Sequence, residues 1–261
     1  MTKEAADMVV TDDSFASIAA AVEEGRGVFD NIRKTVHFLL PCNVSEVLVM
    51  LFVALPGLPL PLLPIQILWM NLVTDGIPAL ALAVDPKAPD LMQRLPRLPD
   101  ARLLDGGRLL AIGAEGLMLS VIALGGFSYN LYGSHQNVEQ ARTVAFTVIV
   151  VAQLVQAFNC RCDRFSLFQL GIGTNRTLLW AFLFSCAMQQ IAVLTGPVAS
   201  PIFKVAVLPL EDWVLMGTMG ALAVCGHGSG QVAKTAKSPD RTGSIHLVMV
   251  TSHSAFASGM R

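Results

Sequence analysis

The sequence predicts an all-α membrane protein, a bundle of about six transmembrane helices in which a cytoplasmic stalk helix extends the first span. Of its 261 residues, 53% are hydrophobic and 14% charged, with a mean hydropathy of +0.58. Soluble domains carry about 25% charged residues. Apolar runs of about 20 residues, long enough to cross a hydrocarbon core, recur along the chain. Lys and Arg gather in alternate connections between these runs.

The N-terminal residues are expected to close a soluble domain. Residues 1–14 hold a short apolar segment between charges and cannot bury a core by themselves. They also lack the basic and apolar regions of a signal peptide. From 15 to 35, "FASIAAAVEEGRGVFDNIRKT" repeats apolar residues at helical spacing, weakened only by Gly25 and Gly27. We therefore predict a stalk helix over 15–35 that continues into the first span.

Residues 36–225 make up the expected transmembrane domain. Its spans are expected at 36–55, 65–84, 108–131, 143–160, 177–195 and 210–225. The last span is the least regular, because glycines interrupt "GTMGALAVCGHGSG". Residues 226–261 are polar with one small apolar run, which predicts a disordered tail.

Positive charge indicates how the chain crosses the membrane. Lys and Arg are concentrated before the first span, after the second and after the fourth. These residues are Arg26, Arg33, Lys34, Lys87, Arg94, Arg97, Arg102, Arg161, Arg164 and Arg176. The opposite connections, "PGLPLPLL", "GSHQNVEQA" and "GPVASPIFKVAV", hold one lysine, with Arg142 at a span edge. Because positively charged connections stay in the cytosol, both ends are expected to be cytoplasmic.

Composition also argues against several other classes of protein. The net charge is −1 and no basic patch is clustered, so we expect no nucleic-acid partner. Five cysteines are an odd number, mostly within or beside apolar runs, and predict no disulfide framework. Cys160 and Cys162 form a lone C-x-C pair, for which we expect no metal role.

The first two spans carry polar side chains inside otherwise apolar sequence. Asn43 and Glu46 lie three residues apart, and so share a helical face. Asn71, Thr74 and Asp75 share a face of the second span. At 1.5 Å per residue, Glu46 and Asp75 each lie about 15 Å deep in a core about 30 Å thick. The two clusters are therefore expected to meet in mid-membrane.

These side chains indicate a site for a hard cation. Carboxylate, amide and hydroxyl oxygens combine there with backbone carbonyls loosened around Gly76 and Pro78. Ca²⁺ takes about six to eight such oxygen ligands, and a cluster without nitrogen or sulfur donors disfavours zinc or copper. The candidate metal ligands are Asn43, Glu46, Asn71, Thr74 and Asp75. The residues alone leave Mn²⁺ and Na⁺ open as well.

The fourth span offers further amides. Gln153, Gln156 and Asn159 recur at spacing three and either supply neutral oxygens to the same centre or hydrogen-bond the helices together. Glu115 in the third span is either a further ligand or a residue at the lipid edge. The alternative for the whole set is interhelical hydrogen bonding. Two acidic groups at matching depth beside a helix break favour the cation site.

Four segments together resemble a known family. They are "AADMVVTDDSFASIAAAVEEGR", "LLPCNVSEVLV", "LPLPLLPIQILWMNLVTDGIPALALAVDP" and "AQLVQAFNCR". In this order and spacing they resemble the C-terminal part of P-type cation-transporting ATPases, especially the calcium-pump-like bacterial members. The resemblance, from Lys3 to about Val224, implies six helices behind a stalk in a bacterial plasma membrane. It also implies that residues 1–14 end a phosphorylation domain.

The same resemblance implies a ligand set. The family's cation ligands in its fifth and sixth helices match Asn43, Glu46, Asn71, Thr74 and Asp75. Gln153 stands where calcium pumps of the endoplasmic reticulum carry a glutamate. This difference puts the first of two calcium sites in doubt. The second, in which Asn71 and Asp75 take part, is better supported and also needs a glutamate from a fourth helix that is not among these residues.

The family's "DKTGT" and "TGES" motifs and its first four helices have no counterpart in the 261 residues. By itself the chain is therefore expected neither to use ATP and Mg²⁺ nor to form an aspartyl phosphate. One interpretation is the Ca²⁺-binding portion of a pump, truncated or joined by the missing N-terminal part. The other is a non-enzymatic membrane protein that binds cations passively or associates with full-length pumps.

Overall fold

The computed structural model describes residues 14–88, 90–96, 103–104, 106–134, 137–161, 175–194, 203–206, 208, 213 and 217–218. Three of the expected segments lie outside this part of the chain. They are the N-terminal remnant up to residue 13, nearly all of the sixth span and the tail over 226–261.

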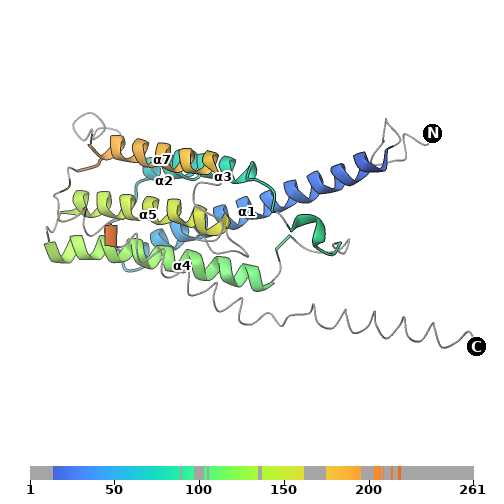
Figure 1. Ribbon diagram of the computed structural model, residues 1–261. Helices are drawn as coiled ribbons and strands as arrows, with labels where there is room; N and C mark the ends of the chain where they lie inside the picture. The colour runs from blue at the N-terminus through green and yellow to red at the C-terminus, as the bar shows by residue number, and fades with distance from the viewer. Residues whose placement is uncertain are drawn as a thin grey trace, which may run out of the picture. The chain divides into compact units, whose positions relative to one another are not determined.

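The first helix, α1 (Phe15–Ala54), is one uninterrupted helix of 40 residues that continues through Pro41. It includes both the expected stalk and the expected first span. Its N-terminal half extends beyond the neighbouring helices (Figure 1), and only Gly27 and Asn31 are buried in that half. The chain turns after the helix at Gly57, whose φ of 71° lies in the left-handed region that glycine tolerates.

The second span is a helix with a break in its middle. It consists of α2 (Pro64–Trp69), a π-helical turn η1 (Met70–Thr74) and α3 (Gly76–Ala83). In the π-turn the Asp75 N–H donates to the carbonyl five residues back, that of Met70, at 2.8 Å. The π-turn lies just before Gly76. Pro78 has no N–H and so cannot donate to a carbonyl one turn earlier, which weakens the regular helix at this point.

The remaining spans are α4 (Gly106–Tyr129), which ends in a π-turn η3 (Asn130–Ser134), α5 (Val138–Arg161) and α7 (Arg176–Leu194). A short 3₁₀ turn, η2 (Leu91–Gln93), lies between the second and third spans. Among the described residues, five helical stretches are long and apolar enough to cross a membrane. These stretches overlap the first five expected spans. The all-α fold class is thereby confirmed, and the protein is a multi-pass membrane protein.

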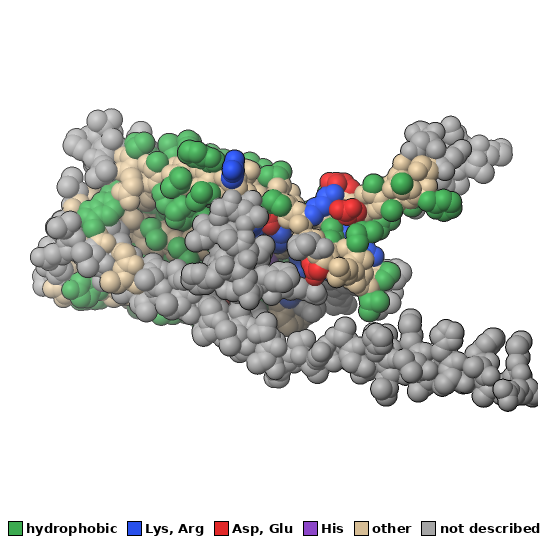
Figure 2. Space-filling model, viewed as in Figure 1, with side chains coloured by type: hydrophobic (Ala, Val, Ile, Leu, Met, Phe, Trp, Pro, Cys, Tyr) green, Lys and Arg blue, Asp and Glu red, His purple; other side chains and the backbone are tan. Residues whose placement is uncertain are grey.

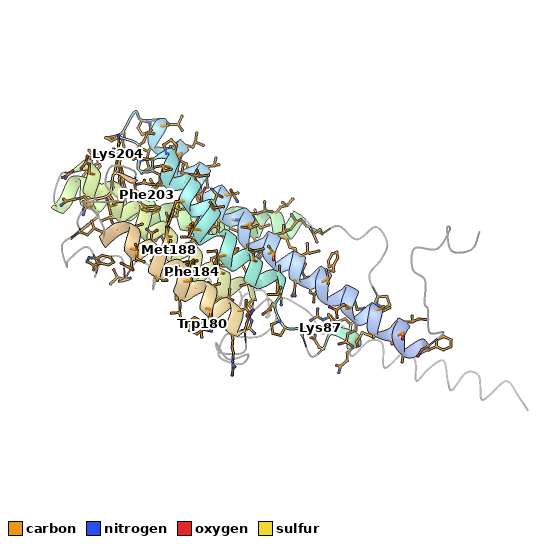
Figure 3. The ribbon with its side chains drawn as sticks, turned by 90° about the horizontal axis from the view of Figure 1, so that it is seen from above. Lys87, Trp180, Phe184, Met188, Phe203 and Lys204 are labelled. Carbon is orange, nitrogen blue, oxygen red and sulfur yellow. The ribbon has the colours of Figure 1, made fainter. Side chains whose placement is uncertain are left out.

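The helix α5 is the buried centre of the bundle. It packs between α4 and α7 and also contacts α1 (Figure 1). In contrast, α7 presents apolar side chains outward. Trp180, Phe184 and Met188 follow one another along it (Figure 3), and the first two are 70% and 53% exposed. Such outward apolar residues suit contact with acyl chains, so the surroundings of the bundle are a lipid bilayer.

Close contact between α1 and α4 depends on a glycine. A Cβ atom at Gly116 would lie 2.6 Å from Val44 Cγ1 and 3.1 Å from the Pro41 carbonyl oxygen. Small residues of this kind let helix backbones approach in membranes, where van der Waals packing drives association.

Gly116→Ala is therefore expected to lower the free energy of unfolding by about 1–3 kcal/mol, because the added methyl group pushes α1 from α4. Gly113→Ala is the matched control, since its Cβ would meet nothing within 4 Å. It should be neutral or slightly stabilising. Thermal unfolding of both variants in detergent tests this, and equal effects of the two substitutions would contradict the packing argument.

Charged side chains gather where α1 leaves the bundle, on the face that Figure 2 shows. The centre of this region is Asp85, which is 5% exposed. Its carboxylate accepts hydrogen bonds from Lys34 Nζ at 2.5 Å, Arg161 Nε at 2.9 Å and Asn175 Nδ2 at 2.7 Å. The Asn31 amide donates to the Asp85 backbone carbonyl at 2.8 Å. One carboxylate thus ties α1, α5 and the start of α7 to the end of α3.

A second group of ion pairs lies further along the stalk and is more exposed. Lys87, labelled in Figure 3, contacts Glu24 at 2.5 Å, and this hydrogen bond raises the pKa of Lys87. Arg94 pairs with Asp90 at 2.8 Å and with Asp30, and the hydrogen bond that Arg94 donates to Asp90 is the main cause that raises the pKa of Arg94. These pairs hold the segment around η2 against α1 but contribute little stability, because water screens them.

Asp85→Asn should destabilise the bundle by about 3–5 kcal/mol, because the buried Arg161 guanidinium loses its counter-ion. Asp90→Asn, which removes one partner of a half-buried pair that water still reaches, should cost about 0–1 kcal/mol. Denaturation of each variant in mixed micelles measures the difference. If both substitutions cost the same, the Asp85 cluster is not the tie between the helices.

Candidate cation site

Glu46 lies at the meeting point of three helical elements. It is 5% exposed on α1. Its Oε2 accepts a hydrogen bond from Asn71 Nδ2 in the π-turn at 2.9 Å, and its Oε1 accepts one from Gln153 Nε2 of α5 at 3.3 Å. The two polar clusters of the first and second spans therefore meet, and the fourth span reaches them through one amide.

Asp75 differs from the other buried carboxylates in its hydrogen bonding. It sits between the π-turn and α3 and is 0% exposed. No described residue donates a hydrogen bond to either carboxylate oxygen within normal geometry. Its backbone is satisfied, since the N–H donates to Met70 and the carbonyl accepts from the Ala79 N–H at 3.0 Å. A buried carboxylate without donors requires a proton or a cation, because water cannot solvate it.

Gln153 adds another unsatisfied acceptor beside Asp75 and Glu46. It is fully buried, and its Oε1 has no donor among the described residues, while its Nε2 is used by Glu46. The carboxylates of Glu46 and Asp75 are close enough to interact electrostatically. Two like charges in a medium of low dielectric constant repel each other unless a positive charge lies between them. The centre is thus rich in acceptors and poor in donors.

Thr74 and the two asparagines occupy the edge of this centre. Thr74 is buried, and its Oγ1 donates to the Met70 carbonyl at 3.0 Å, which leaves its lone pairs able to accept. Asn71 is exposed although its amide reaches Glu46. Asn43 is exposed as well and donates to the Leu39 carbonyl at 2.8 Å, so it lies outside the buried group.

The amides of α5 do not converge on one centre. Gln156 Nε2 donates to Glu115 Oε2 at 2.9 Å, and Asn159 Nδ2 lies 3.5 Å from Gln156 Oε1. Only Gln153 reaches Glu46. Glu115 is 9% exposed, so it is not a lipid-edge residue, and its carboxylate accepts from Gln156 and not from Gln153.

Sequence reasoning missed Cys42. This thiol is fully buried, packs with Ala79 one turn after Asp75 and lies near the Asp75 carboxylate without a hydrogen bond of normal geometry. The polar cluster around Asp75 therefore includes a sulfur atom, and the expectation of a cluster without sulfur is wrong. Cys42 lies four residues before Glu46, so helical spacing could have placed both on one face. Cys42, Cys160 and Cys186 are free thiols in the described part of the chain.

No three His, Cys, Asp or Glu side chains in the described residues gather tightly enough to hold a metal ion. A cation bound by Glu46 and Asp75 would therefore also need oxygens from the amides, the Thr74 hydroxyl or segments beyond the described residues. The set fits a hard cation with many oxygen ligands better than a tightly bound transition metal.

Without a cation, Asp75→Asn is expected to stabilise the chain by about 1–3 kcal/mol, because it removes a buried carboxylate that lacks donors. The matched comparison is Asp85→Asn, which acts on a buried carboxylate with three donors and should have the opposite sign. Unfolding in detergent with a chelator present measures both. A loss of stability in Asp75→Asn would mean that Asp75 already has a partner.

A multi-pass helical bundle with two buried carboxylates beside a broken helix is the membrane domain expected of an ion-translocating protein. Residues 59–227 match the family described as "Cation transporting ATPase, C-terminus". The chain belongs to this family, the C-terminal region of P-type cation-transporting ATPases. The resemblance found in the sequence is thereby confirmed.

Several curated relatives share most of this chain. It is 39% identical over 222 residues to the calcium-transporting ATPase of Bacillus subtilis (strain 168), covering 85% of this chain and 25% of the relative. It is 39% identical over 214 residues to the probable cation-transporting ATPase F of Mycobacterium tuberculosis (strain ATCC 25618 / H37Rv), covering 82% and 23%. The endoplasmic reticulum calcium ATPase srcA of Aspergillus fumigatus is 32% identical over 243 residues, covering 82% and 25%. The chain thus spans about a quarter of the length of these relatives.

Proposed function

We propose that this chain is the cation-binding transmembrane portion of an ATP-driven pump, with Ca²⁺ as the transported ion. The observation that carries the proposal is the fully buried Asp75 carboxylate, whose two oxygens have no donor among the described residues. The proposed ligands are Glu46, Asn71, Thr74 and Asp75, with Gln153 as a neutral amide ligand and Asn43 at the edge.

Charge balance favours a divalent ion at this position. The ionised carboxylates of Glu46 and Asp75 carry two negative charges, and one divalent cation cancels them within the apolar bundle. A monovalent ion would leave one negative charge uncompensated, at a high free-energy cost in a membrane. The printed names of several relatives, which describe calcium transport, also support Ca²⁺.

The remaining ligands and the energy source are proposed to come from the rest of a pump. The exposed amide of Asn71 bonds Glu46, and the exposed Asn43 lies three residues before Glu46 on α1, so a further helix on this side can complete the ion's coordination. ATP and Mg²⁺ would act through that other part, which is the proposed partner of this chain. The charged region around Asp85 is proposed to face the cytosol of a bacterial cell, together with both ends of the chain.

Asp75→Asn is expected to abolish cation-dependent ATP hydrolysis when the chain is co-expressed with a segment that supplies the rest of the pump. Thr74→Val should have an intermediate effect, because it loses one oxygen and keeps its volume. Gln153→Ala should have the least effect, since a neutral amide gives a divalent ion less than a carboxylate does. The measurement is Ca²⁺-dependent turnover and Ca²⁺ affinity at fixed pH, so that carboxylate protonation stays constant.

Glu139→Gln is the control, because Glu139 is exposed in the first turn of α5 and should leave turnover unchanged. If Asp75→Asn binds and transports Ca²⁺ like the parent, the carboxylate only holds helices together and the site is wrong. If the chain instead binds Ca²⁺ through Asp75 with no second segment and never supports turnover, it is a passive cation-binding membrane protein.

A further inference from the structure

A second polar cluster lies inside the bundle and is not part of the cation site. His37 of α1 is 8% exposed and Glu115 of α4 is 9% exposed. His37 Nε2 lies 3.6 Å from Glu115 Oε2, and Gln156 Nε2 of α5 donates to the same carboxylate oxygen at 2.9 Å. A base, an acid and an amide from three different helices therefore meet in one buried place.

This cluster is separate from the Glu46 group. His37 and Glu46 are nine positions apart on α1, which is about 14 Å of helix. Two amides of α5 bond different carboxylates: Gln153 donates to Glu46, and Gln156 donates to Glu115. The cluster lies on the side of Glu46 that leads to the charged region around Asp85.

Two of the other titratable groups on the packed helices are engaged with Asp85. On α1, Lys34 lies one turn before His37 and is bound to Asp85. On α5, Arg161 is also bound to Asp85. Further ionisable groups on the packed elements include Cys42 and Glu46 on α1, Arg108 on α4, Cys160 on α5 and Asp75 before α3.

The net charge of the His37–Glu115 pair depends on how many protons it holds. With one proton the pair is neutral overall, either as imidazolium and carboxylate or as imidazole and carboxylic acid. With no proton it carries a buried charge of −1, and with two protons a buried charge of +1. Each charged state costs free energy within an apolar bundle. The one-proton state is therefore the stable one over a wide pH range.

We propose that His37 and Glu115 form a proton-binding site, which holds one proton between α1 and α4 and is distinct from the cation site. The Gln156 amide donates to the carboxylate and so favours its ionised form, which places the proton on His37. Because the partners belong to different helices, the pair is intact only while α1 and α4 stay packed against each other.

The test uses the full chain in lipid nanodiscs with ¹⁵N-labelled histidine, followed by NMR over a pH range of about 5 to 9. The sequence has five histidines, and His37→Gln identifies the His37 signal by its loss. We expect the His37 signal to remain that of an imidazolium at about pH 8, where histidines with an ordinary pKa of about 6.5 are neutral. In Glu115→Gln the imidazolium signal of His37 should be lost at the same pH.

Two controls separate this site from the rest of the bundle. Glu139→Gln removes an exposed carboxylate of α5 and should leave the His37 signal unchanged. Asp75→Asn should also leave it unchanged, with or without Ca²⁺, so this test does not depend on the proposed cation site. Loss of the imidazolium signal in Asp75→Asn would show that the two sites are one.

Infrared spectroscopy of the parent chain tests whether the proton lies on Glu115 and not on His37. A carboxylic acid band at about pH 8 that disappears in Glu115→Gln would place the proton on Glu115 and would equally support a one-proton pair. The proposal is overturned if the parent shows a neutral His37 at that pH and no such band. This outcome is read from the parent alone, so it stands even if a substituted chain fails to fold.

Discussion

The Glu46 carboxylate holds together three elements that are far apart in the sequence. It accepts one amide from the π-turn of the second span and one from α5, and it belongs to α1 itself. In a membrane interior no water is present to satisfy a polar group, so each such group must find a partner within the protein. This constraint decides which helix faces turn inward, and the polar residues of the bundle are arranged accordingly.

Two buried aspartates show the two ways in which the constraint is met. Asp85 has three side-chain donors from α1, α5 and the residue before α7, and it ties the charged end of the bundle together. Asp75 lies beside the helix break with no donor among the described residues. A stabilising role accounts for the first. Asp75 has no such structural partner, and a bound cation would supply the positive charge that its carboxylate lacks. The proposed function therefore rests on Asp75.

The position of α5 at the centre of the bundle has a direct consequence for the chemistry. Its glutamines at 153 and 156 lie one turn apart and bond two different carboxylates, Glu46 and Glu115. The bundle therefore contains two polar centres, one with unsatisfied acceptors and one with an acid beside a base. The proposed cation and proton sites therefore lie at different places on the same three helices, α1, α4 and α5, together with the broken second span.

Much of this protein was determined by its sequence alone. Apolar runs of sufficient length predicted five spans that the structure contains, because membrane crossing depends on local composition. Helical spacing predicted that the polar clusters of the first two spans meet, since both lie at one depth. The family followed from motifs in order, and residues 59–227 match it.

Only the tertiary structure decided how the polar side chains are paired. Periodicity placed Gln153, Gln156 and Asn159 on one face of α5. It did not predict that Gln156 donates a hydrogen bond to Glu115. Glu115 finds His37, and Cys42 lies against the Asp75 group, because of how α1, α3, α4 and α5 pack. Spacing along a helix specifies a face, whereas the partner of that face depends on helix crossing and on close contacts such as the one at Gly116. Local sequence carries the first kind of information, and only the assembled bundle carries the second.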